Sequence, residues 1–133
     1  ICVINADGSG QRRLTTRDDA RHYYPALAPD GQSVLFSSNM DGRFELYELD
    51  FTGSLTRLGQ TGIAPAVSPD NRYIAFTQNT GSTDSIWLMD RNGDNPRQVI
   101  ANGWDPTWSP HGKRLLFATT LNRPVANRFT ASG

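Results

Sequence analysis

A chain of 133 residues, of which 37% are hydrophobic, is long enough to form one domain with a core of its own. Its 13 lysine and arginine residues balance 13 aspartate and glutamate residues, so there is no net charge to attract a phosphate backbone or an anionic lipid surface. No run of residues approaches the ~20 apolar positions that span a bilayer. We therefore expect neither a nucleic-acid partner nor insertion into a membrane.

Two kinds of hairpin alternate along the chain. The first kind opens it, with an apolar run at residues 1–4, turn-forming residues at 5–10 and a short second strand at 11–16. This pattern predicts two antiparallel strands. The same hairpin returns over residues 44–58 and 85–100, each time with a glycine in its turn.

The second kind of hairpin contains two prolines and occurs three times. Its copies occupy residues 24–36, 64–76 and 105–117. A second proline begins the turn of each copy, and the aspartate that follows it in the first two copies is expected to accept hydrogen bonds from nearby backbone amides. Each copy ends in a continuous apolar triplet, which is typical of a strand covered on both faces. We predict that these triplets form the core.

The spacing of the repeats indicates the fold. Pro25 and Pro65 are 40 positions apart, and Pro65 and Pro106 are 41 positions apart. A period of ~40–45 residues with four short strands is typical of a β-propeller blade. We predict an all-β fold, a β-propeller built from three four-stranded repeats of about 40 residues each. Residues 1–118 are assigned to the blades, and residues 119–133, which depart from the repeat, are expected to be an irregular or disordered tail.

The repeated pattern resembles a known family. A Pro-x-hydrophobic-Ser/Ala-Pro-Asp-Gly segment, an apolar triplet ending in Phe, an Asn-Ala-Asp-Gly-Ser type of turn and Leu-Thr are similar to the WD-like repeats of TolB-like β-propellers. The family includes the C-terminal domain of TolB and the propellers of tricorn-like and prolyl-peptidase-like proteins. The resemblance covers residues 1–118 and implies a protein-binding module that is periplasmic or secreted, with the cytoplasm still open.

The number of repeats leaves the assembly open. Propellers usually close with about four to eight blades, whereas this sequence supplies three. It starts with the second half of one blade and ends with the first half of another, so unpaired edges are expected at both ends. Either the sequence is a fragment of a larger propeller, or two copies form a twofold homodimer with six blades.

The residue types needed for catalysis or metal binding are not grouped in the sequence. No Gly-x-Ser-x-Gly elbow is present, and His22 and His111 fall in different repeats. The Ser-Pro-His segment at 109–111 is the third copy of a structural turn. Cys2 and the histidines lack a zinc-ligand spacing, and the turn at 5–10 lacks the terminal carboxylate of a calcium loop. We expect no catalytic residue, no metal and no cofactor.

One connection between hairpins differs from the others. Residues 16–24 carry an insertion that is both charged and aromatic. Because the first strand of each blade starts at one mouth of a propeller channel, the loops that lead to these strands would converge there. We predict a surface for a protein or peptide partner formed by His22, Tyr23, Tyr24, Ile63, Trp104 and Asp105, with ordinary loop packing as the alternative.

These features favour a non-catalytic interaction scaffold that presents loops around a channel. Two alternatives remain open. One is the substrate-gating propeller of a serine peptidase whose hydrolase domain is absent from this sequence. The other is a relative of metal-dependent polysaccharide lyases, which would require clustered histidines.

Overall fold

The computed structural model describes residues 1–79 and 81–120, and every regular element in this part of the chain is a β-strand. The strands are β1 (Cys2–Val3), β2 (Arg12–Arg13), β3 (His22–Leu27), β4 (Ser33–Ser38), β5 (Glu45–Asp50), β6 (Leu55–Thr61), β7 (Ile63–Val67), β8 (Tyr73–Asn79), β9 (Asp84–Asp90), β10 (Arg97–Ile100), β11 (Trp104–Trp108) and β12 (Leu115–Ala118). Among these residues no helix is long and apolar enough to cross a membrane.

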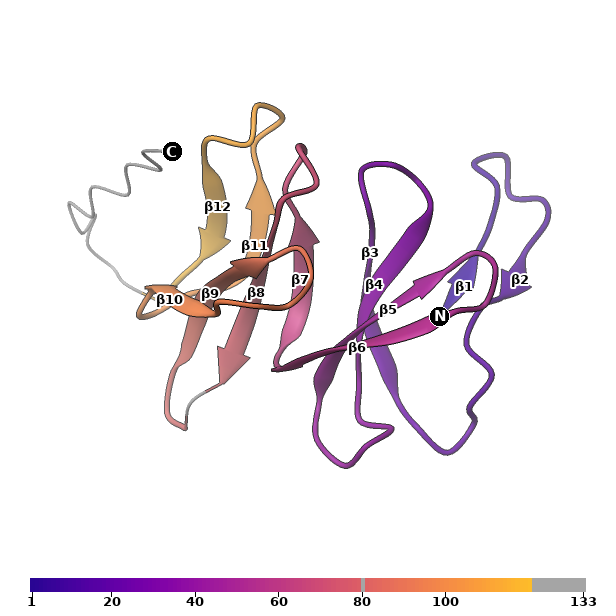
Figure 1. Cartoon of the computed structure of the whole chain (residues 1–133), viewed down its shortest axis with the longest axis horizontal. Helices are drawn as coiled ribbons and strands as arrows, with labels where there is room; N and C mark the ends of the chain where they lie inside the picture. The colour runs from indigo at the N-terminus through magenta and orange to yellow at the C-terminus, as the bar shows by residue number, and fades with distance from the viewer. Residues whose placement is uncertain (80, 121–133) are drawn as a thin grey trace.

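The strands form antiparallel sheets that follow one another along the molecule (Figure 1). Strands β3 to β6 make the first full blade and strands β7 to β10 the second, and in each blade strands that are consecutive in sequence pair in space. The pair β1–β2 lies at one end of the row, and the pair β11–β12 packs on the other side of the second blade. We call these pairs half-blades. The predicted all-β architecture with four-stranded antiparallel units is confirmed.

Some expected boundaries differ from those observed. The strands predicted at residues 1–4 and 11–16 are only two residues long each, because β1 and β2 pair with each other alone in the described part of the chain. The tail predicted at 119–133 falls almost entirely outside the described residues. Thr119 and Thr120 are the exceptions: the Thr119 hydroxyl donates to the Asn102 carbonyl oxygen at 2.9 Å, and the Asn102 side-chain amide donates to the Thr120 hydroxyl at 3.5 Å.

The Pro-containing turns form as their sequence predicts. The backbone amide two residues further on donates to the carboxylate of Asp30 at 3.0 Å and to that of Asp70 at 3.2 Å. In the third copy, where His111 replaces the aspartate, the Ser109 hydroxyl accepts from the Arg114 amide at 3.1 Å. The equivalent Ser68 hydroxyl of the second copy accepts from the Tyr73 amide at 2.9 Å, so this serine bond is present with or without the carboxylate.

Successive residues of strand β4 belong to different cores. Val34 and Phe36 pack in a cluster on the side of the first half-blade, whereas Leu35 packs with Ile74 and Phe76 of the second blade. This alternation follows from the strand geometry, in which neighbouring side chains point to opposite faces. It explains why three consecutive residues of the strand are apolar, since the second blade covers one face of β4 and the first half-blade covers the other. The core prediction is confirmed for the triplets in β4 and β8.

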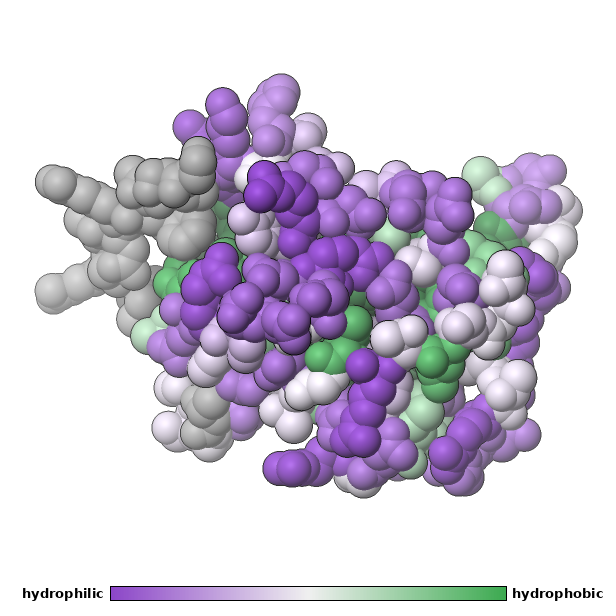
Figure 2. Space-filling view, viewed as in Figure 1, coloured by the Kyte–Doolittle hydropathy of each residue, from purple (hydrophilic) through white to green (hydrophobic). Residues whose placement is uncertain are grey.

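The third apolar triplet is not buried as predicted. Leu116 of β12 is 65% exposed, although its equivalent Leu35 is fully buried. The described residues place no blade beyond β12 to cover it. At the opposite end Leu27 is 64% exposed, whereas its equivalent Trp108 packs against the second blade and donates from Nε1 to a carbonyl oxygen of that blade at 2.9 Å. The face seen in Figure 2 is mostly hydrophilic, with apolar residues in small separate patches.

Two contacts join the full blades, an ion pair and a close approach of two backbone segments. Arg91 donates from Nη1 and Nη2 to both carboxylate oxygens of Glu48, at 2.7 and 2.5 Å, and from Nε to Asn71 at 2.8 Å. The hydrogen bonds from Arg91 hold the pKa of Glu48 below its usual value. Close by, the backbone of Gly93 approaches the Leu58 carbonyl so tightly that a Cβ would lie 2.4 Å from its oxygen.

Candidate functional site

The inner strands of three successive sheets share an unusual backbone feature. Strand β7 contacts both β3 and β11, so these strands lie side by side. Each has one residue with a positive φ directly before a proline: Tyr24 at 57°, Ala64 at 52° and Asp105 at 54°. The pairing register with the next strand breaks at each of these positions. Such bulges redirect a side chain out of the regular strand pattern.

The three bulges open onto one cavity. It has a volume of about 210 Å³, and it is lined by Tyr24, Pro25, Ala64, Pro65, Asp105, Pro106 and Thr107. The Asp105 side chain is exposed and has no hydrogen bond or ion pair within residues 1–79 and 81–120. Tyr24 is 47% exposed. The cavity therefore combines apolar proline walls with one free carboxylate and one accessible phenol ring.

A hydrogen bond fixes the backbone of the third bulge. The Asp105 amide donates to Thr77 Oγ1 in the neighbouring blade at 2.9 Å. The equivalent hydroxyl one blade earlier, that of Ser37, is buried and has no partner in the described part of the chain. A hydrogen bond to Thr77 thus ties the Asp105 bulge to the second blade. The Ala64 bulge makes no equivalent bond to Ser37.

An aromatic platform stands beside the cavity. Tyr23 stacks on Phe44 with ring centroids 5.9 Å apart, and the Tyr24 ring meets Tyr23 edge-on at 6.4 Å. Tyr23 is 47% exposed, so much of its ring remains available to a partner. Phe44 ends the loop between β4 and β5, where the Tyr47 hydroxyl donates to Asp41. Burial, aided by that bond, raises the pKa of Tyr47 to about 12, so the phenol remains a donor at ordinary pH.

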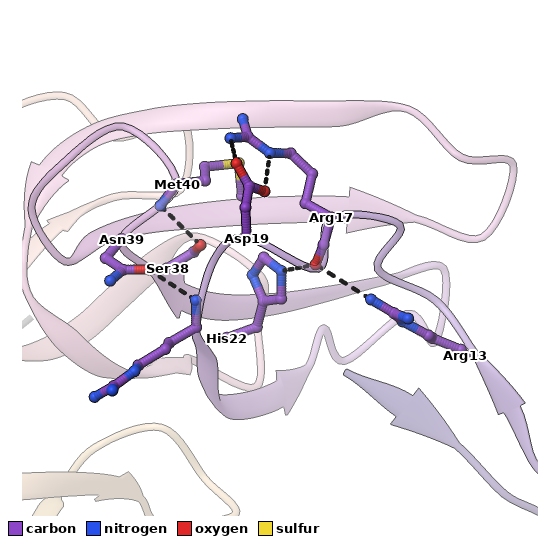
Figure 3. Close-up of polar contacts among 8 residues, drawn as sticks. Arg13, Arg17, Asp19, His22, Ser38, Asn39 and Met40 are labelled. Carbon is purple, nitrogen blue, oxygen red and sulfur yellow. Dashed lines mark hydrogen bonds and ion pairs between the residues drawn. The ribbon is translucent and has the colours of Figure 1, made fainter.

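His22 belongs to a different environment. Its ring meets the edge of Phe36 at 5.7 Å between centroids, and Nε2 lies 3.3 Å from the Arg17 carbonyl oxygen (Figure 3). Nδ1 is buried without a partner among the described residues. The side chain lines a second cavity, of about 140 Å³, between the first half-blade and the first blade, together with Met40 and Leu14. The structure therefore separates His22 from the cavity that Tyr24 and Asp105 share.

The insertion before β3 carries exposed ion pairs. Arg17 pairs with Asp19 at 2.6 Å and Arg13 with Asp18 at 2.7 Å (Figure 3 draws the first). The hydrogen bond from Arg17 holds the pKa of Asp19 below its usual value. Because solvent screens such exposed pairs, they contribute little to stability.

The position of His22 is glycine in the other two blades. A Cβ at Gly62 would lie 2.7 Å from the Phe76 ring, and one at Gly103 would lie 2.7 Å from the Phe117 ring. In the first blade the imidazole instead covers the edge of the equivalent ring, that of Phe36. The first blade therefore differs from the repeat where its insertion joins β3.

The described residues do not assemble a hydrolytic or metal centre. Neither imidazole ring, of His22 or His111, hydrogen-bonds to a serine or a carboxylate in residues 1–79 and 81–120. Within the same residues no group of three or more His, Cys, Asp or Glu side chains is placed to hold a metal ion. The cavity between β3, β7 and β11 instead presents an aromatic ring, proline walls and a carboxylate.

Comparison with known proteins decides the family. The family model described as the TolB beta propeller domain matches residues 1–129. The chain belongs to the TolB β-propeller family.

Curated relatives of this TolB propeller chain are considerably longer than it is. It is 33% identical over 118 residues to the protein TolB homolog of Chlorobium chlorochromatii, covering 77% of this chain and 27% of that protein. It is 35% identical over 114 residues to the Tol-Pal system protein TolB of Anaeromyxobacter dehalogenans, covering 81% of this chain and 26% of the relative. The chain thus spans about a quarter of the length of these relatives.

Solved structures agree with the TolB assignment. The structure of putative TolB from Agrobacterium tumefaciens superposes with a TM-score of 0.78 at 26% identity, over 87% of this chain and 44% of that one. An oligogalacturonate lyase in complex with manganese has a TM-score of 0.70 at 17% identity, over 91% of this chain and 38% of that one. The likeness to the lyase is one of fold alone.

The TolB propeller structure groups the six predicted contact residues differently from the sequence. All lie in strands β3, β7 and β11 rather than in loops, because the inner strands begin earlier than the repeat indicates. Tyr24 and Asp105 line the shared cavity, while Tyr23, Ile63 and Trp104 each precede a bulge by one residue. It was not predicted from the sequence that Pro25, Pro65 and Pro106 line this cavity. Their regular spacing identified the repeat, and each directly follows the bulged residue of its strand.

Proposed function

We propose that the chain is a non-catalytic protein-interaction module of a TolB-type propeller, which binds a protein or peptide partner at the channel mouth. The convergence of three bulged strands on one cavity beside an exposed aromatic platform carries this proposal. Half-exposed Tyr23 and Tyr24 offer a large apolar area with polar tips, the side-chain type enriched at protein interfaces. Ile63 and Trp104, each next to a bulge, would extend the same surface.

The proposed partner follows from the name of the relatives. Anaeromyxobacter TolB is called a Tol-Pal system protein, so we take Pal as the first candidate partner. The TolB resemblance also supports a periplasmic location as part of this proposal. The lyase and peptidase alternatives receive no support from the site, since its carboxylate stands without a catalytic or metal-binding neighbour in the described residues.

Replacing Tyr23 by alanine tests the contact surface. We expect Tyr23→Ala to weaken binding of purified Anaeromyxobacter Pal about tenfold in calorimetry, and Trp104→Ala to do the same, because tyrosine and tryptophan side chains commonly dominate interface energies. Leu55→Ala is the matched control, since Leu55 is 48% exposed on the outer strand β6. Unchanged Pal affinity in Tyr23→Ala, with a circular-dichroism spectrum like that of the parent chain, would argue against this surface.

Self-association is the second part of the proposal. Strand β12 pairs only with β11, and β1 only with β2, so each half-blade has a free edge in the described chain. For the isolated chain a second copy is the available source of pairing strands, with β1 and β2 of one copy completing the blade begun by β11 and β12 of the other. In a longer protein further blades would take that place.

Light scattering tests this pairing. We expect the isolated chain to show twice the monomer mass at micromolar concentration, and Leu116→Lys to return it to the monomer mass, because a charge would replace an apolar side chain in the new interface. A monomer mass for the unmodified, folded chain would rule out completion by a second copy.

A further inference from the structure

We propose that the channel-mouth cavity receives an arginine side chain of the partner, whose guanidinium pairs with Asp105 and stacks on the Tyr24 ring. This inference rests on the proposed function and adds the chemistry of the ligand. The two recognition groups come from different sheets, β3 and β11, and they line the same cavity of about 210 Å³.

The charge of the cavity comes from Asp105 alone. Its exposed carboxylate has no hydrogen bond or ion pair to any residue described, and the other lining residues are uncharged. The bulge at φ 54° lies in a conformation that aspartate tolerates better than most residues do. An accessible carboxylate without a partner in the described chain, beside uncharged walls, favours a cation that can donate charge-assisted hydrogen bonds to both of its oxygens.

The shape of the cavity selects the kind of cation. Calcium and magnesium take six or more oxygen ligands, and zinc takes several His, Cys or carboxylate ligands, whereas Asp105 is the only such side chain among the described residues that line this cavity. Proline has no backbone N–H, so Pro25, Pro65 and Pro106 leave gaps in any main-chain pairing with an added strand. Recognition by a side chain therefore fits these walls better than strand addition does.

The Tyr24 ring favours guanidinium over ammonium. Guanidinium is planar, it is weakly hydrated, and it combines stacking on an aromatic face with paired hydrogen bonds to a carboxylate. Tyr24 is 47% exposed, and its ring is held edge-on against Tyr23. The ring therefore forms an accessible, preoriented wall of the cavity.

A peptide titration tests the inference. The probe is the acetylated, amidated tripeptide Gly-Arg-Gly, and its control is Gly-citrulline-Gly, which keeps the shape of the side chain and removes the charge. We expect the arginine peptide to shift the amide resonances of Tyr24, Ala64 and Asp105 saturably, with the citrulline peptide at least about tenfold weaker. Asp105→Asn, which keeps both size and tolerance of positive φ, should weaken the arginine peptide about tenfold as well.

A matched variant controls for net charge. Asp30→Asn removes the same charge in the turn after β3 and should leave arginine-peptide binding unchanged. Equal binding of the citrulline peptide, unchanged binding in Asp105→Asn, or no saturable shift would each overturn the inference. If these fail while Tyr23→Ala still weakens Pal binding, the proposed function stands without the arginine pocket. If Tyr23→Ala leaves Pal binding unchanged while the arginine peptide still binds and depends on Asp105, the arginine site stands and the proposed partner is wrong.

Discussion

Replacing Gly93 by alanine is expected to lower the free energy of unfolding by about 3 kcal/mol or more, the largest single-residue effect that we predict. Gly93 has a φ of 96° in the turn between β9 and β10. A Cβ there would lie 2.4 Å from the carbonyl oxygen of Leu58, which is backbone and has no rotamer in which to yield. The substitution would therefore force the two full blades apart at a point where they also share the Arg91–Glu48 pair.

The equivalent turn of the first blade provides the matched control. Gly53 has nearly the same φ, 98°, but an added Cβ would meet no atom within 4 Å. Gly53→Ala should therefore cost about 1 kcal/mol, the backbone term alone. Urea unfolding of both variants separates the conformational cost from the clash between blades. Equal destabilisation of the two would contradict the close contact at Leu58.

Removing the Arg91 side chain is expected to lower the free energy of unfolding by about 2 kcal/mol. Arg91→Ala leaves Glu48, which is largely buried, with only the Ser33 hydroxyl as a donor, at 2.6 Å. It also removes a bidentate bond that joins the two full blades through residues 43 positions apart in sequence. Arg17→Ala is the control, because its pair with Asp19 is exposed and screened by solvent and should contribute little to stability.

The contribution of this pair depends on pH in a defined direction. Arg91 holds the pKa of Glu48 below the usual 4.5, so the folded chain releases the proton more readily than the unfolded chain does. The stabilisation is therefore fully present above pH ~4.5 and is lost as the pH falls through the lower pKa of the folded state. The difference in unfolding free energy between the parent chain and Arg91→Ala should shrink in acid. A difference that stays constant from pH 7 to pH 3 would contradict the ion pair.

The repeat architecture could be predicted because it depends on local patterns that recur. The proline spacing and the apolar triplets identify the blades, and each turn carries its own signal in residues such as Asp30 and Asp70. The contacts that join the blades do not recur. Glu48 aligns with Leu88, and Arg91 aligns with Phe51, so the ion pair occupies one interface and has no periodic signature.

The candidate site could be predicted only in part. The aromatic insertion and Asp105 stand out in the sequence, but the positive φ of Tyr24, Ala64 and Asp105 does not. A residue before proline favours extended backbone, and alanine has no preference for the left-handed region. Packing of three inner strands imposes this conformation against local preference. His22 lines a different cavity from Tyr24 and Asp105, and the glycines at its equivalent positions leave no side chain from which this could be inferred.

The alternation in strand β4, with Val34 and Phe36 against one neighbour and Leu35 against the other, has a thermodynamic meaning. The apolar burial of a blade is divided between its contact with the neighbour before it and its contact with the neighbour after it. The stability of the chain therefore depends on the interfaces between neighbouring blades, as in repeat proteins whose single units are only marginally stable. The exposed Leu27 and Leu116 are the terminal members of that array, where a unit is coupled on one side only.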